Sequence, residues 1–215
     1  MNAALPGVGA ASAEAEQRAV RQTEVVTALS ALLPAHTLLW HAEDTVPYEC
    51  DGLTAYREQP LVVALPETEV QVAAVLRECH RLNVPVVARG AGTGLSGGAL
   101  PNRLGVTLSL AKFNRIVNLD PVARTAVVQC GVRNLAISEA ATPYGLYYAP
   151  DPSSQIACTI GGNVAENSGG VHCLKYGLTL HNVLRVRGYT VSGEAVEFGS
   201  EALDCAGLEI GRAHV

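Results

Sequence analysis

The stretch Val84-Pro-Val-Val-Ala-Arg-Gly-Ala-Gly-Thr-Gly-Leu-Ser-Gly-Gly-Ala-Leu-Pro101 decides how the rest of the chain is interpreted. Its first part, 84–88, is rich in β-branched residues and predicts a strand. The next part contains five glycines within nine residues, so it predicts a loop whose bare backbone approaches another group closely. A second strand is predicted at 105–110. The order is therefore strand, glycine loop, strand.

Within the loop, Gly92, Gly94 and Gly97 match G-x-G-x-x-G, the dinucleotide fingerprint of Rossmann domains. In those domains the loop opens a helix, and the N–H groups of its first turn bind the pyrophosphate. Here Pro101 and a predicted strand follow the glycines, which disfavours that helix. Successive backbone N–H groups bind a diphosphate without a helix terminus. We therefore expect a nucleotide cofactor in a different fold.

The composition describes an ordinary globular chain of 215 residues, 48% hydrophobic and 16% charged, long enough for a sizeable core. A net charge of −5 gives no indication of nucleic-acid binding. The six cysteines form no C-x-x-C pair and no zinc spacing, which predicts no metal site and a reducing compartment. Charges in the first thirty residues argue against a signal region, and no segment approaches the ~20 apolar residues of a membrane span. We expect a soluble cytoplasmic protein.

Hydrophobic periodicity divides the chain into successive units. Residues 1–59 are predicted to contain a frayed terminus (1–12), a helix (13–33) that ends before Pro34, and an irregular lead-in. Residues 60–115 are predicted to form a first subdomain, with a small βαββ unit over 60–110. Residues 116–208 are predicted to form a second, truncated subdomain. Its predicted elements are paired strands at 116–119 and 125–130, a helix at 134–142, a helical turn at 163–167 and a hairpin of 184–191 with 194–198.

A second unusual stretch lies in this second unit, about sixty residues after the first loop. It comprises Pro150-Asp-Pro-Ser-Ser154 and then Cys158-Thr-Ile-Gly-Gly-Asn-Val-Ala-Glu-Asn-Ser-Gly-Gly170. A single glycine loop is more often only a turn. Two of them, each with hydroxyl residues and each after a strand, favour one shared ligand site.

The two loops resemble the FAD-binding domain of the vanillyl-alcohol oxidase (p-cresol methylhydroxylase, PCMH) flavoprotein family. The resemblance runs from about Trp40 to about Gly207 and is carried by 88–99, 150–154 and 159–177. It is closest to the FAD-linked glycolate oxidase subunit and D-lactate dehydrogenase branch. It implies an α+β, PCMH-type FAD-binding fold, with the small βαββ subdomain and a second, incomplete α/β subdomain whose sheet is mainly antiparallel.

The resemblance also implies which residues bind FAD. Those that would wrap the diphosphate are Arg89, Gly90, Ala91, Gly92, Thr93, Gly94, Leu95 and Ser96. Those beside the flavin are Pro150, Asp151 and Ser154, and those along the ribityl chain and ring are Thr159, Gly161, Gly162, Ala165, Ser168, Gly169 and Val171. Relatives that bind flavin covalently use a histidine or cysteine in the first loop or elsewhere. Residues 89–98 contain neither, so we expect FAD to be bound non-covalently.

The implied function is that of the FAD-binding part of a 2-hydroxy-acid oxidoreductase of glycolate or D-lactate type. Such an enzyme transfers a hydride from the substrate Cα to flavin N5 and yields a 2-oxo acid. In the family, the base and the carboxylate-binding groups come largely from a cap that this chain lacks. The catalytic residues are therefore not assigned, His172 and Lys175 are only weak candidates, and the chain alone is expected to be inactive.

The resemblance further implies partner subunits and a reading frame that is truncated relative to the family. Glycolate oxidase relatives act with an iron–sulfur subunit and a flavoprotein-like subunit, which would place the protein in the cytoplasm or peripherally at the inner membrane. Residues 209–215, Glu-Ile-Gly-Arg-Ala-His-Val, depart from the expected leucine-rich continuation and resemble a translated sequencing adapter. They are interpreted as a foreign tail and excluded from fold reasoning.

Three alternatives stay open at this point. One is another FAD-linked oxidase of the same fold, such as a sugar-lactone oxidase or an alkyl-glycerone synthase. Another is a non-catalytic nucleotide-binding module. The third is an NAD-binding Rossmann domain, which a helix directly after Gly98 would support.

Overall fold

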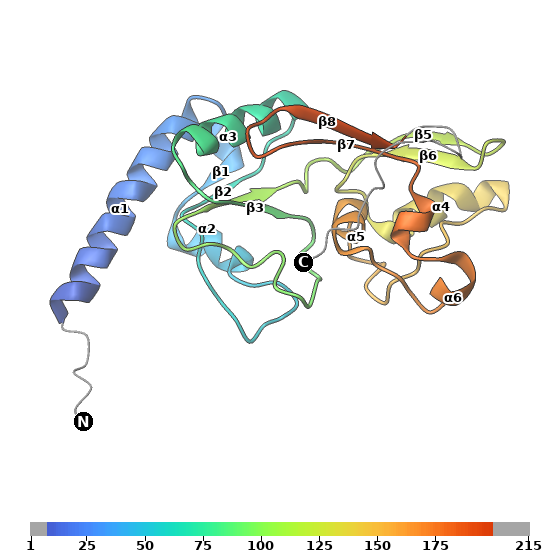
Figure 1. Ribbon diagram of the computed structural model, residues 1–215, viewed down its shortest axis with the longest axis horizontal. Coiled ribbons are helices and arrows are strands. Elements are labelled where there is room, and N and C mark those ends of the chain that lie inside the picture. Colours follow the sequence, from blue (N-terminus) through green and yellow to red (C-terminus); the bar gives the residue numbers. More distant parts are fainter. Residues whose placement is uncertain (1–7, 200–215) are drawn as a thin grey trace.

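The computed structural model describes residues 8–199, with side chains described from residue 13 onward (Figure 1). A long helix, α1 (Val8–Ser30), opens the described chain and confirms the helix predicted at 13–33. It begins inside the stretch 1–12 that the sequence predicts as a frayed end. The predicted tail, 209–215, and the last part of the predicted second subdomain, 200–208, lie outside the described residues. The subdomain boundaries after residues 59 and 115 stay predictions.

The glycine loop connects two parallel strands of a four-stranded sheet whose order is β1-β2-β4-β3. The strands are β1 (Leu38–Leu39), β2 (Val62–Ala64), β3 (Val86–Arg89) and β4 (Val106–Ser109). Only β1 runs antiparallel to its neighbour. The crossover from β2 to β3 is helix α3 (Glu69–Arg81), whereas the crossover from β3 to β4 is irregular. This arrangement confirms the predicted βαββ unit. No helix directly follows Gly98, because the next regular element is strand β4.

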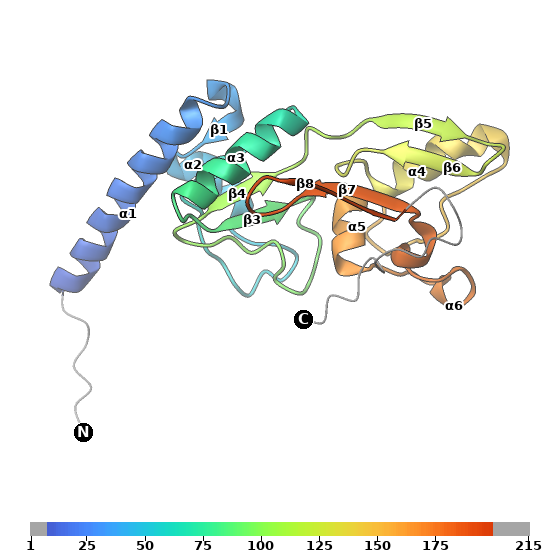
Figure 2. The same cartoon turned by 45° about the horizontal axis from the view of Figure 1, so that its top comes forward.

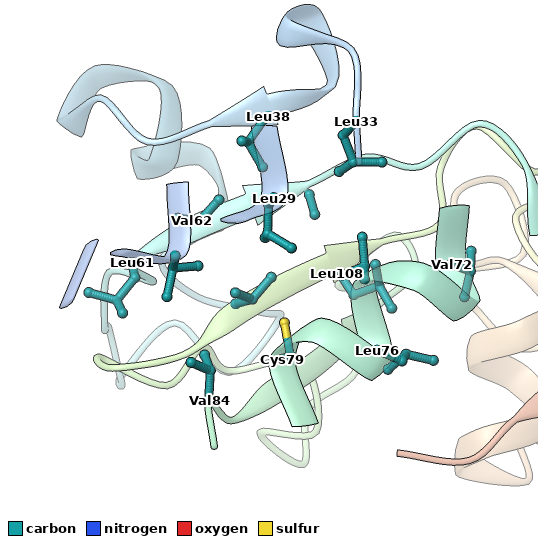
Figure 3. Close-up of a cluster of buried hydrophobic side chains, with 14 of the residues drawn as sticks. Leu29, Leu33, Leu38, Leu61, Val62, Val72, Leu76, Cys79, Val84 and Leu108 are labelled. Atoms are coloured by element: carbon teal, nitrogen blue, oxygen red, sulfur yellow. The ribbon is translucent and has the colours of Figure 1, made fainter. Parts of the chain in front are cut away.

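The main hydrophobic core lies between this sheet and the two long helices α1 and α3 (Figure 3). Val25 and Leu29 from α1 and Val75 from α3 are fully buried against Val62 of β2 and neighbouring strand residues. Burial of one such aliphatic side chain stabilises a fold by about 1.5–3 kcal/mol. This core fixes the end of β3, where the glycine loop begins.

Besides the four-stranded sheet, the chain forms two antiparallel ribbons and several short helices and turns. Both ribbons lie in the second unit, as the sequence predicts. The first ribbon pairs β5 (Ile116–Asp120) with β6 (Thr125–Val128), and the second pairs β7 (Arg185–Tyr189) with β8 (Ala195–Gly199). The helices are α2 (Ala42–Thr45), α4 (Asn134–Ala141), α5 (Ile160–Glu166) and α6 (Cys173–Tyr176). Short 3-10 turns lie at Ala35–Thr37, Val46–Tyr48, Thr142–Tyr144 and Thr179–Asn182.

The β7–β8 ribbon reaches back over helix α3 (Figures 1 and 2). An Arg77 guanidinium N–H of α3 donates to the Gly193 carbonyl at the ribbon turn, with an N–O distance of 3.1 Å. Arg187 of β7 forms an ion pair with Glu69 at 2.8 Å, and the Tyr189 ring packs against the main core. These contacts join the last described strands to the first crossover helix.

Candidate functional site

The two glycine-rich stretches lie side by side because α5 packs along the loop that follows β3. A Cβ atom added to Gly90 would lie 2.3 Å from Thr159 Oγ1 and 4.0 Å from the Gly162 nitrogen, so this approach requires glycine. At the other end of α5, Ser96 Oγ donates to Glu166 Oε2 at 2.9 Å. The structure thus brings the predicted residues Gly90, Ser96, Thr159 and Gly162 together.

The first loop presents backbone donors that have no protein acceptor. Within the described residues, none of the N–H groups of residues 90–99 donates a hydrogen bond to the protein. Gly92 and Gly97 have φ angles of +69° and +78°, in the left-handed region that favours glycine. Successive free N–H groups around left-handed residues form a concave anion-binding surface. The loop therefore suits a phosphate group, as the sequence predicts.

Arg89 lies beneath this loop. Its side chain is buried, and its Nη1 atom donates to the Cys50 carbonyl at 2.8 Å and to the Ala99 carbonyl at 3.4 Å. A Cβ atom on Gly92 would lie 2.4 Å from Arg89 Nη2, so the loop wraps around the guanidinium. These contacts hold both ends of the loop to the neighbouring segment. A direct contact of Arg89 with the cofactor stays a prediction.

The second stretch is fastened by a side-chain pair between Asp151 and His172. His172 Nδ1 lies 2.6 Å from Asp151 Oδ2, and the His172 backbone N–H donates to Asp151 Oδ1 at 3.3 Å. The hydrogen bond from the His172 side chain lowers the pKa of the Asp151 carboxyl. A Cβ on Gly170 would lie 2.1 Å from Asp151 Oδ1. The segment containing Pro150 and Ser154 is thereby fixed beside the loop that contains Gly169 and Val171.

A pair of buried asparagines supports the site from below, and the sequence analysis did not single out either of them. Asn163 Nδ2 donates to Asn134 Oδ1 at 2.8 Å, and Asn134 Nδ2 donates to the Pro150 carbonyl at 3.0 Å. Both side chains are almost completely buried, where an unpaired amide would cost about 1–3 kcal/mol. They join α4, α5 and the Pro150 segment. The sequence marks them only weakly: Asn134 is a polar residue at the start of a predicted helix, and Asn163 directly follows two glycines.

Several other predicted residues lie at the surface. Leu95 and Val171 are 72% and 85% exposed, and Ala91 and Ala165 are also exposed. The weak catalytic candidate Lys175 is exposed as well, with its ammonium 4.9 Å from the Tyr176 ring centre. The remaining predicted residues, half-buried between these positions, are Thr93, Gly94, Gly161 and Ser168.

Thiol chemistry and metal binding have little basis in the part of the chain that the structure describes. Cys158 is buried, and burial raises the pKa of the core thiol Cys79 to about 12, so that thiol stays protonated. In residues 8–199, no group of three or more histidine, cysteine or acidic side chains is arranged to bind a metal ion. No helix of these residues is long and apolar enough to cross a membrane.

The βαββ unit, the antiparallel ribbons and the paired glycine loops define a protein that binds a nucleotide cofactor outside the Rossmann fold. Residues 60–199 match the family described as FAD binding domain. The chain belongs to this FAD-binding family.

Individual relatives agree with the family match. The chain is 60% identical over 191 residues to the glycolate oxidase subunit GlcD of Escherichia coli (strain K12). This match covers 89% of this chain and 38% of the relative. It is 35% identical over 175 residues to D-2-hydroxyglutarate dehydrogenase of Xanthomonas citri pv. viticola, covering 81% of this chain and 37% of the relative. The chain thus spans less than two fifths of the length of these curated relatives.

A solved structure shows the same fold at low sequence identity. The structure of alkyldihydroxyacetonephosphate synthase matches this chain with a TM-score of 0.72 and 22% sequence identity. The match covers 81% of this chain and 34% of the synthase chain. The PCMH-type fold inferred from the two loops is therefore confirmed.

The residues present fit FAD, the cofactor of this family. Thr159 Oγ1 is buried and has no hydrogen-bond partner among the described residues, although it faces the first loop across Gly90. A cofactor oxygen would satisfy such a hydroxyl. The free N–H groups of residues 90–99 supply the donors that a diphosphate needs.

Proposed function

We propose that the chain is the FAD-binding part of a flavin-dependent 2-hydroxy-acid oxidoreductase of the glycolate or D-lactate type. The observation that carries this proposal is the run of unpaired N–H groups at residues 90–99, which lies against α5 and the unpaired hydroxyl of Thr159. The names of the relatives, a glycolate oxidase subunit and a D-2-hydroxyglutarate dehydrogenase, support the substrate class.

In this proposal, the N–H groups of Gly90–Ser96 bind the FAD diphosphate, and the hydroxyls of Thr93 and Ser96 add donors. Thr159 binds a ribityl or phosphate oxygen, and the Asp151–His172 pair fixes the backbone beside the flavin ring. The bound FAD supplies a hydride acceptor at flavin N5 for the substrate Cα hydrogen. Because residues 89–98 contain no histidine or cysteine, these contacts are non-covalent.

The groups that remove the hydroxyl proton and bind the substrate carboxylate are assigned to the part of the longer relatives that this chain does not span. His172 Nδ1 is paired with Asp151, and in this proposal the pair positions the backbone beside the flavin. Iron–sulfur and flavoprotein-like partner subunits, and a peripheral place at the inner membrane, belong to the same proposal. The name of the Escherichia coli relative, which calls it a subunit, supports an assembly.

The first prediction is direct binding of FAD by the purified chain. Adding FAD to the apoprotein should quench flavin fluorescence and raise the melting temperature. At 100 times the dissociation constant, the free energy of unfolding should rise by about 2.7 kcal/mol. NAD serves as the matched comparison, since it also contains a diphosphate but would require a Rossmann helix. A chain that gains no stability with FAD and retains no chromophore would contradict the proposed function.

A further inference from the structure

A carboxylate, that of Glu166, lies against the loop proposed to bind the diphosphate. Besides accepting the hydrogen bond from Ser96, it places Oε1 2.8 Å from the position that a Cβ on Gly98 would occupy. The corresponding distance at Gly94 is 3.7 Å. The carboxylate therefore faces the middle of the loop, between the two ends that Arg89 holds. The sequence analysis did not single out Glu166.

The charge of Glu166 is not balanced by a neighbouring basic side chain. Among residues 13–199, Ser96 is the only side chain with which it forms a hydrogen bond, and it takes part in no ion pair. The loop beside it carries N–H groups without acceptors. A negative charge beside a row of free donors lowers the positive potential that these donors offer to an anion.

Resting on the proposed function, we propose that the carboxylate of Glu166 opposes binding of the FAD diphosphate at this loop and turns away from the loop when FAD binds. A diphosphate on the same loop would bring like charges within a few ångströms of the carboxylate, and this repulsion opposes binding. Glu166 is the last residue of α5, is exposed, and precedes Asn167, whose φ is +47°. Its side chain can therefore leave the loop for solvent without disturbing the helix.

The test compares Glu166→Gln with the wild type. Glutamine keeps the shape and can still accept the Ser96 hydrogen bond, but it removes the charge. The matched control is Glu14→Gln, which removes one charge from the exposed surface of α1, outside the candidate site. Affinities are measured by fluorescence for FAD and riboflavin and by calorimetry for ADP. Circular dichroism and the melting temperature of each apoprotein confirm that the variants fold.

Glu166→Gln should bind FAD and ADP about fivefold more tightly at low ionic strength, while riboflavin, which lacks phosphate, should bind unchanged. The gain should shrink at ~1 M salt, where charges are screened beyond about 3 Å. Glu14→Gln should match the wild type throughout. Equal or weaker FAD binding by Glu166→Gln, or an equal gain with riboflavin, would overturn the inference while leaving the proposed function intact. Absence of FAD binding in every variant would overturn the proposed function, and the inference with it.

Discussion

At the scale of single residues, the contact between Gly90 and Thr159 explains why the first loop needs a glycine at its start. The Thr159 hydroxyl occupies the space where any side chain at position 90 would begin. Among the described residues this hydroxyl is buried without a partner, a state that costs about 1–3 kcal/mol. A bound cofactor would recover part of that cost, which couples ligand binding to the stability of this contact.

Gly90→Ala should therefore destabilise the apoprotein by about 1–3 kcal/mol, because the added methyl group must displace Thr159 or the loop. FAD affinity should fall as well. Urea unfolding measures the first effect and fluorescence titration the second. The control is Gly188→Ala in β7, where no atom lies within 4 Å of the added Cβ and φ is not positive. Equal stabilities for the two variants would contradict the close approach of Gly90 to the Thr159 hydroxyl.

The Asp151–His172 pair gives a prediction of pH dependence. The hydrogen bond from His172 lowers the pKa of Asp151 in the folded protein below its ordinary value, near 3.9 in an unfolded chain. The pair thus stabilises the fold fully above that value, and the contribution is lost as pH falls through the lower, folded pKa.

The measurement is the melting temperature of the wild type and of Asp151→Asn between pH 7 and pH 2. The wild type should have the higher melting temperature at neutral pH, and the difference should vanish at the acid end. The pKa of the Asp151 carboxyl, followed by NMR, should be higher in His172→Gln than in the wild type. A difference between wild type and Asp151→Asn that is constant across the range would show that the ionised pair is not its source.

The residue types that line the site were predictable, whereas their partners were not. Glycines and hydroxyls beside a strand have a local meaning that the sequence displays directly. Glu166, Asn134 and Asn163 act through contacts with residues that are 29 or 70 positions away in the chain, and no local pattern marks such a contact. For the same reason, the pairing of Asp151 with His172 could not be predicted from the sequence.

At the scale of elements, the helices that follow hydrophobic periodicity were predicted well, and α5 was not. The predicted turn at 163–167 is in fact a helix that begins at Ile160. Two glycines in its first turn argue against a helix by intrinsic propensity. Tertiary contacts override that preference. The Ile160 and Gly161 N–H groups donate to the Val132 and Cys130 carbonyls, and Gly161 packs closely on Cys130.

The contact of the β7–β8 ribbon with α3 supplies a prediction at this scale. Gly193 has a φ of +73°, and a Cβ there would lie 2.6 Å from the Ala73 carbonyl oxygen. Gly193→Ala should cost about 1–3 kcal/mol of unfolding free energy by overpacking. Glu69→Gln, which removes the exposed ion pair with Arg187, should cost less than about 1 kcal/mol. Chemical denaturation compares them, and a larger loss for Glu69→Gln would show that charge rather than packing holds the ribbon.

At the scale of the whole molecule, the site lies where the mixed four-stranded sheet meets the part of the chain that contains the antiparallel ribbons. Arg89 at the end of β3 belongs to the sheet, and Thr159, which caps the start of α5, belongs to the part of the chain that contains the ribbons. Neither part contains the whole site. The sequence predicted both parts through their periodicities, but their relative placement depends on packing between segments that are distant in sequence.

The ribbon lying over α3 also has a consequence for the order of events during synthesis. The bond from Arg77 to Gly193 spans 116 residues, and the pair of Glu69 with Arg187 spans 118. The sheet of β1–β4 requires only residues up to 109, so it can form while the ribbon is still inside the ribosome. Closing so long a separation is slow compared with local pairing. The nascent chain should therefore pass through a stage in which the glycine loop already exists but α3 still exposes the surface that the ribbon later covers, a surface available to chaperones.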